Sequence, residues 1–157
     1  MSKTSTVRKD IGTDESVPKR KMHHPVVEAG IASASAEKRE AYEKAVDVEM
    51  NALSELNIAR FSAASKAPEA EMKAVRKAFQ ALEKCANDDT LQAVDDAIDA
   101  ALDALPEKKK QFVNYTQEIY ELAGTVADAA LVSLIGTLPK KKRKAIKDLG
   151  GFPRRYI

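Results

Sequence analysis

The chain has 157 residues, 44% of them apolar, with 26 Ala, six Gly, six Pro and an aromatic share of only 5%. This length fits a single domain, and because Ala is the best helix former while Gly and Pro are scarce, the composition predicts an all-α protein. The single cysteine, Cys85, excludes a disulfide framework.

Charge is sorted along the chain, although the net charge is only +2. Residues 88–105 carry six Asp and no cation, whereas residues 139–157 carry eight cations and one carboxylate, Asp148. This separation predicts one acidic face and one strongly basic end.

Residues 1–34 have the composition of an extended, flexible arm. They mix Ser, Thr, Lys, Asp, Gly and Pro without a sustained apolar period. The first residues lack the apolar core of a signal peptide, which predicts an intracellular or virion setting. His23 and His24 are adjacent, so their side chains diverge in an extended arm and we expect no metal site there.

Residues 35–138 are predicted to form a helical body with helices over 35–66, 68–86, 89–105 and 107–138. Ser35 is a suitable N-cap for the first helix, and Pro68 ends it because proline lacks an N–H. Cys85 falls among the apolar positions of the second helix and is expected in the core. The apolar stripe of the first helix comprises Tyr42, Val46, Met50, Leu53 and Leu56.

The third helix, 89–105, combines an apolar stripe with an acidic surface. Asp89 is its expected N-cap, with Gln92 as a capping-box partner. The predicted core residues are Leu91, Val94, Ile98, Leu102 and Leu105. The remaining surface carries Asp95, Asp96, Asp99 and Asp103, which we interpret as a solvated face or as a dock for the basic end, without calcium-loop spacing.

The fourth helix, 107–138, is predicted to pack through Phe112, Ile119 and Val126. From Leu122 its apolar face extends nearly all round, as in a helix enclosed by other helices or by lipid. The segment 122–138 is shorter than the roughly 20 residues of a membrane span and contains Asp128. A core helix is therefore favoured, and a membrane-active helix is the alternative.

The joints at Pro68 and Pro106 are shorter than the roughly 2–5 loop residues of a full helical reversal. The chain is therefore either an antiparallel bundle of about four helices or an elongated helical hairpin. In both cases an Ala-rich body leaves stripes that neighbouring subunits would cover, so we expect a homo-oligomer or a larger assembly.

Residues 139–157 form a basic C-terminal arm, with a short helix expected over 140–149 and a left-handed cap at Gly150 and Gly151. Clustered cations suit polyphosphate because binding releases condensed counterions. The expected partner is nucleic acid or an acidic protein surface, the helix 89–105 included. The predicted binding residues are Lys140, Lys141, Lys142, Arg143, Lys144, Lys147, Arg154 and Arg155.

The hexapeptide Pro139-Lys140-Lys141-Lys142-Arg143-Lys144 resembles the nuclear-import signal of a polyomavirus large T antigen. The resemblance covers six of the 157 residues. It implies a nuclear location if this segment is exposed.

The sequence contains no Gly-rich phosphate loop, no Gly-x-Ser-x-Gly elbow and no metal-ligand spacing of Cys and His. We therefore predict a non-enzymatic structural or assembly protein of a virion or nucleoprotein, without cofactor or metal, whose basic arm contacts nucleic acid or an acidic partner. The alternatives are a helical adaptor or inhibitor that binds another protein through an apolar helix face, and a membrane-active helix.

Overall fold

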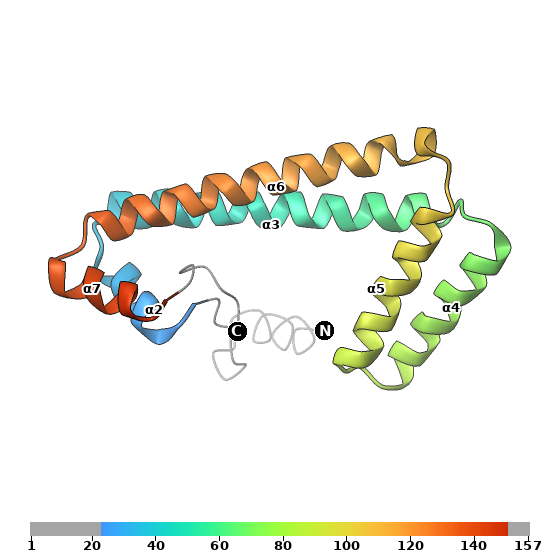
Figure 1. Cartoon of the computed structure of the whole chain (residues 1–157), viewed down its shortest axis with the longest axis horizontal. Coiled ribbons are helices and arrows are strands. Elements are labelled where there is room, and N and C mark those ends of the chain that lie inside the picture. Colours follow the sequence, from blue (N-terminus) through green and yellow to red (C-terminus); the bar gives the residue numbers. More distant parts are fainter. Residues whose placement is uncertain (1–22, 151–157) are drawn as a thin grey trace, which may run out of the picture. The chain divides into compact units, whose positions relative to one another are not determined.

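A computed structural model of the chain describes residues 23–150 (Figure 1). Within this range every regular element is a helix, which confirms the all-α prediction. The helices are α2 (Pro25–Ser33), α3 (Ala36–Ala64), α4 (Glu69–Lys84), α5 (Asp88–Asp103), α6 (Glu107–Gly136) and α7 (Lys140–Asp148).

The chain divides into two compact units. The larger one, Ala36–Val132, is called here the α3–α6 unit. The described residues of the other, 23–35 and 133–150, form the α2–α7 unit.

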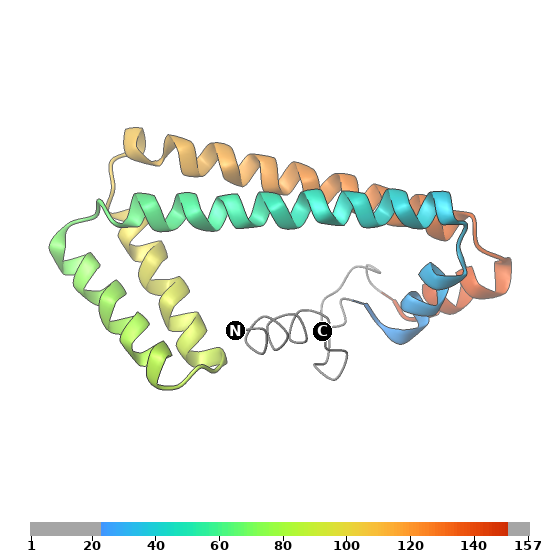
Figure 2. The ribbon, with the colours of Figure 1, turned by 180° about the vertical axis from the view of Figure 1, so that it is seen from behind.

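In the α3–α6 unit, α3 and α6 lie side by side and run in opposite directions (Figure 2). Helices α4 and α5 form a short hairpin, and α5 also packs against α3. The Pro68 and Pro106 joints are turns between separate helices rather than kinks inside one helix.

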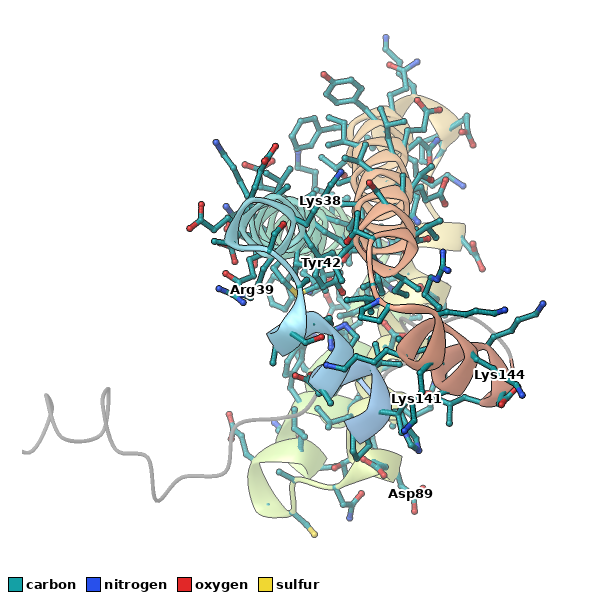
Figure 3. The ribbon with its side chains drawn as sticks, turned by 90° about the vertical axis from the view of Figure 1, so that its left-hand side faces the viewer. Lys38, Arg39, Tyr42, Asp89, Lys141 and Lys144 are labelled. Atoms are coloured by element: carbon teal, nitrogen blue, oxygen red, sulfur yellow. The ribbon has the colours of Figure 1, made fainter. Side chains whose placement is uncertain are left out.

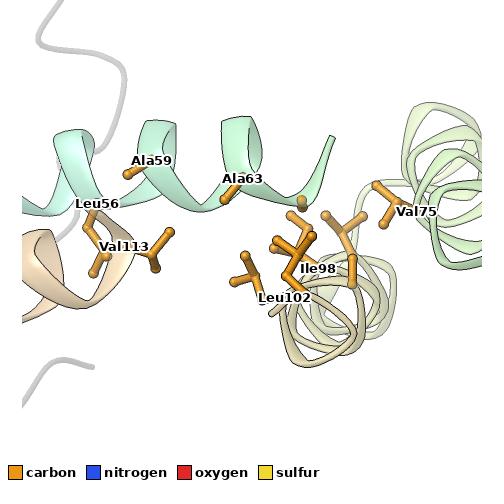
Figure 4. Close-up of a cluster of buried hydrophobic side chains, with 11 residues drawn as sticks. Leu56, Ala59, Ala63, Val75, Ile98, Leu102 and Val113 are labelled. Atoms are coloured by element: carbon orange, nitrogen blue, oxygen red, sulfur yellow. The ribbon is translucent and has the colours of Figure 1, made fainter. Parts of the chain in front are cut away.

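The core of this unit is a cluster of buried side chains where α3, α4, α5 and α6 meet (Figure 4). Much of it is alanine, and Ala101 is fully buried. Beside it, the rings of Phe61 and Phe79 meet edge to face with centroids 5.5 Å apart. The cluster comprises Leu56, Ala59, Ala63, Ala64, Val75, Val94, Ile98, Ala101, Leu102, Leu105 and Val113.

Helices α3 and α6 have buried residues at heptad spacing, and several of these residues are alanines. The buried positions of α3 are Tyr42, Glu49, Ala52, Leu56, Ala59, Ala63 and Ala64, and all but Ala64 follow one another at steps of 7, 3, 4, 3 and 4. The corresponding side of α6, called here the buried stripe, comprises Val113, Thr116, Tyr120, Ala123 and Ala127, at steps of 3, 4, 3 and 4, and the fully buried Leu131 continues it. Tyr120 is half-buried and the other four are buried.

Gly124 allows a close approach in this seam, because a Cβ there would stand 2.9 Å from Glu49 Oε2. Glu49 is itself buried. The buried Thr116 hydroxyl donates a 2.9 Å hydrogen bond to the carbonyl oxygen of Val113 and is thus satisfied within its own helix.

The buried positions differ from the predicted ones in two helices. In α3 the small residues are buried, whereas Val46, Met50 and Leu53 are only half-buried. In α6 the residues expected to pack, Phe112, Ile119 and Val126, are exposed. The reason is that α6 meets α3 through the positions one residue further along the helix.

Leu91 is also exposed, although it was expected in the core. It lies in the first turn of α5, at the free tip of the α4–α5 hairpin, which α3 does not reach. Val94, Ile98, Leu102 and Leu105, further along the same face, are buried.

Two helix starts also differ from those predicted. Helix α5 begins at Asp88 with Asn87 as N-cap, where Asn87 and Thr90 form a reciprocal capping box in place of Asp89 and Gln92. Residues 25–33, expected in an extended arm, form α2, because His24 Nδ1 accepts the Val26 N–H at 3.1 Å and Pro25 occupies the first turn. Residues 1–22 of the predicted arm lie outside the described residues.

Candidate functional site

The basic arm begins with α7, a nine-residue helix that carries six cations. Pro139 is its N-cap, and the Arg143 N–H donates to the Pro139 carbonyl at 3.0 Å. The helix ends at Leu149, and Gly150 adopts the expected left-handed conformation with φ of 71°. Lys141 and Lys144 extend from the helix surface (Figure 3).

Apolar packing around Gly30 holds α7 against α2. Ile146 is 7% exposed, and the backbone of α2 at Gly30 comes close to it. A Cβ on Gly30 would stand 3.0 Å from Ile146 Cδ1 and 3.1 Å from Leu138 Cδ1, so glycine permits this approach. A nine-residue helix is too short to be stable alone, so Ile146 positions the whole cationic helix.

The histidines support α2. His24 supplies the cap, and the buried His23 contacts Glu28 through Nδ1 and Oε1 at 2.9 Å. The sequence prediction had given these histidines no role, although His-Pro before an apolar run is a signal for a helix start.

All six cations of α7 are exposed, and within the α2–α7 unit none of them forms an ion pair. The described residues of this unit contain two carboxylates, Glu28 and Asp148. Four of the cations, Lys140, Arg143, Lys144 and Lys147, follow the spacing i, i+3, i+4, i+7, which places them on one stripe. The unit therefore presents a dense positive surface.

The charges of α7 oppose its own helix. Lys140, Lys141 and Lys142 occupy the first turn, where the helix dipole disfavours cations, and neither an acidic residue nor a side-chain cap offsets them there. Lys140–Lys144 and Arg143–Lys147 are like-charge i,i+4 pairs, which are also unfavourable. An anion bound at this helix would relieve both effects.

Six of the eight predicted binding residues are thus together on one helix, and Arg154 and Arg155 lie outside the described residues. The acidic face of α5 has a partner within its own unit. Arg60 of α3 donates from Nη1 to Asp95 Oδ1 at 3.0 Å and from Nη2 to Asp99. Burial lowers the pKa of Arg60, because it disfavours the charged form. The hydrogen bonds and negative charges of Asp95 and Asp99 outweigh this effect, so the pKa of Arg60 is raised above its ordinary value.

A second feature is an apolar groove of about 560 Å³ between α3 and α6. Its lining residues are Ala41, Lys44, Ala45, Val48, Ile119, Leu122, Ala123 and Val126. On the α6 side it continues into what we call the exposed stripe, which consists of Phe112, Tyr115, Ile119, Leu122 and Val126. Leu122 is 66% and Phe112 65% exposed, which is high for side chains of this size.

One helix among the described residues, α6, is long and apolar enough to cross a membrane by length and composition. Only 22% of its most apolar window is buried, so it is not an enclosed core helix. However, Glu118, Glu121 and Asp128 follow one another at steps of 3 and 7 along one side of it, and a spanning helix would carry these carboxylates into hydrocarbon.

The other candidate groups give no further site. Within residues 23–150, no three His, Cys, Asp or Glu side chains gather closely enough to hold a metal ion. Cys85, expected in the core, is exposed at the end of α4, where its Sγ lies 3.3 Å from Asn87 Nδ2.

Comparison with known proteins finds no matching family model, and neither a curated protein nor a solved structure matches the chain. A functional assignment therefore depends on the two surfaces described above.

Proposed function

We propose that this chain is a non-enzymatic assembly protein of a nucleoprotein or virion that binds nucleic acid through α7. The observation that supports this proposal best is the exposure of six cations on nine residues, none of which is ion-paired within the α2–α7 unit.

The dimensions of α7 fit a duplex backbone. Nine helical residues extend about 13 Å, and B-DNA presents one charge for each roughly 1.7 Å of its axis, so about eight phosphates lie within the length of the helix. Neutralising them releases counterions, which favours binding at low salt.

The residue types of α7 favour contacts to phosphate over the readout of adenine or the stacking of bases. Its residues are Lys, Arg, Ala, Ile and Asp, so it contains no Asn or Gln to pair with adenine and no aromatic ring on which a base could stack. Lysine contacts to phosphate position a protein on the backbone but carry no sequence information.

The unfavourable charges of α7 support an anionic partner over a purely solubilising role. Three lysines at the positive end of a helix dipole weaken the helix, and each such placement costs about 0.3–1 kcal/mol. Bound phosphates reverse the sign of this interaction.

The test is fluorescence anisotropy with a labelled DNA duplex across a range of salt concentrations. Four to six phosphate contacts predict a log–log slope of about −4 to −5. Lys140→Glu with Lys141→Glu should reduce the slope by about 2 and weaken binding.

Lys108→Glu with Lys109→Glu is the matched control, because these exposed lysines also follow a proline in the first turn of a helix and the change in charge is the same. An equal loss of affinity in both double variants, or a slope near zero in the unmodified chain, would contradict the proposal. Competition by polyglutamate as strong as that by DNA of equal charge would indicate an acidic protein partner instead.

The exposed stripe of α6 favours a second candidate function, a helical adaptor that binds a different protein through its apolar face. In that case the α7 variants would leave function intact, whereas Leu122→Asp would abolish binding of the partner without changing helicity measured by circular dichroism.

A nuclear location is a separate proposal. Import receptors bind extended segments, but residues 140–144 are helical. Nuclear import therefore requires α7 to unfold, and Ile146→Asp, which removes its apolar anchor, should increase nuclear accumulation of a fluorescent fusion of the whole chain. No accumulation of either form would rule this location out.

A further inference from the structure

We propose that the groove between α3 and α6 is the docking site for α6 of a second copy of this chain, so that two α3–α6 pairs form a four-helix dimer. This inference deepens the assembly part of the proposed function.

The first observation is the spacing of the exposed stripe. Phe112, Tyr115, Ile119, Leu122 and Val126 follow one another at steps of 3, 4, 3 and 4, which is the heptad pattern of a helix–helix seam. The chain already uses this pattern once, since the buried stripe of α6 has the same steps.

The second observation is that the two stripes lie next to each other on α6. Each exposed residue directly precedes a residue of the buried stripe, and one residue is about 100° of helix rotation. A surface helix needs one apolar arc of about that width, whereas α6 has two. One arc faces α3, and within the α3–α6 unit nothing covers the other.

The third observation is that short side chains of α3 line the groove. Ala41, Ala45 and Val48 leave a space of about 560 Å³ beside Ile119, Leu122 and Val126. Short side chains allow close helix approach, so a ridge of larger residues from another helix fits between α3 and α6.

The sequence also indicates the occupant. A helix that fills the groove must present aromatic and aliphatic side chains at heptad spacing. The exposed stripe of α6 from a second copy presents such side chains. The sequence of residues 1–22 holds Val7, Ile11 and Val17 at uneven spacing and does not supply one. A symmetric contact in which each copy provides both ridge and groove closes as a dimer.

Charge agrees with this arrangement. Lys44 is the one charged residue that lines the groove, and Glu118 flanks the exposed stripe between Tyr115 and Leu122. We place the second α6 antiparallel to the first, in the register that pairs Glu118 of one copy with Lys44 of the other. Such rim pairs set register and orientation.

The available area is sufficient. The two exposed rings alone offer on the order of 250 Å². With three aliphatic side chains and the α3 wall, the patch reaches several hundred Å², which is the size of apolar patches that often mark interaction sites. It approaches the roughly 800 Å² per partner of a standard interface.

The main test compares two substitutions on the same helix by analytical ultracentrifugation of the whole chain. The substitutions are Val126→Glu and Val132→Glu. Val126 lines the groove and Val132 lies off the exposed stripe, yet both valines are 55% exposed. The unmodified chain should dimerise. Val126→Glu should raise the dissociation constant about tenfold or more, and Val132→Glu should change it by less than about twofold.

A charge exchange tests the occupant itself. Lys44→Glu and Glu118→Lys should each weaken the dimer, and the two together should restore most of the affinity. A monomeric unmodified chain, equal effects of the two valine substitutions, or no recovery in the double variant would overturn the proposal.

Two further results separate the alternatives. Flotation of the unmodified chain with phosphatidylcholine vesicles, lost in Val126→Glu, would assign the stripe to a membrane and overturn a second copy as its occupant. A monomeric Val126→Glu variant should still bind DNA with the salt dependence expected of α7. This result would support the dimer seam as a site distinct from the nucleic-acid site. If α7 proves inert while the two valine substitutions differ as expected, nucleic-acid binding fails and the dimer stands.

Discussion

The core where α4 and α5 meet α3 can be tested with one substitution, Ile98→Ala. Ile98 is 9% exposed and lies in the cluster with Val94, Ala101 and Leu102. Truncating a buried isoleucine costs about 2–5 kcal/mol, and the loss grows with the cavity that remains. Alanines form much of the surrounding cluster and have no side-chain length with which to fill that space, so we expect about 3–4 kcal/mol.

That loss is a large part of the stability of a chain of this size, which is typically 5–15 kcal/mol. It corresponds to a decrease in Tm on the order of 10 °C. Urea unfolding followed by circular dichroism should show a lower midpoint with an unchanged m-value, since the surface exposed on unfolding is nearly the same.

Leu91→Ala is the control on the same helix, because Leu91 is 55% exposed at the tip of the hairpin. It should change stability by less than about 0.5 kcal/mol. If Leu91→Ala destabilised the chain as much as Ile98→Ala, the hairpin tip would be covered in solution and the assignment of Ile98 to the unit's own core would be refuted.

Three further predictions concern ion pairs, glycines and α7. Arg60→Met should lower the free energy of unfolding by up to about 1 kcal/mol, because the half-exposed ion pairs of Arg60 with two carboxylates of α5 join α3 to α5. Arg76→Met breaks a more exposed ion pair and should have no measurable effect in urea melts. Gly30→Val should destabilise the α2–α7 contact by about 1–3 kcal/mol, because the added side chain overpacks against Ile146. Gly136→Ala has open space around it and should stabilise α6 by about 0.5–1 kcal/mol. Thermal melts in which Gly136→Ala is the less stable of the two variants would contradict this packing. Lys141→Glu should strengthen α7 while weakening DNA binding, so helicity should rise and affinity should fall when both are measured on one sample. A loss of both helicity and affinity would mean that Lys141 supports the fold.

The composition and apolar periods of the sequence were sufficient to predict the all-α class, but α2 was missed because its residues were expected in an extended arm. Proline at residues 68, 106 and 139 marks the starts of α4, α6 and α7, because a residue without an N–H fits the first turn or the cap of a helix. The concentration of cations on α7 was equally visible, since charge density is a property of the sequence itself. The role of His24 as a cap was missed, because the preceding residues resembled an arm.

Tertiary structure alone decided which half of the apolar arc of α6 is buried. Phe112, Ile119 and Val126 are larger than Val113, Ala123 and Ala127, yet the smaller residues face α3. Hydrophobicity ranks residues by the area they can bury, but the packing of two long helices selects by shape, and between Val113 and Ala127 the side of α6 with the smaller side chains is the buried one. The sequence by itself thus determined the all-α class and the charge of α7, whereas the packing of α3 on α6 determined which large residues of α6 remain exposed.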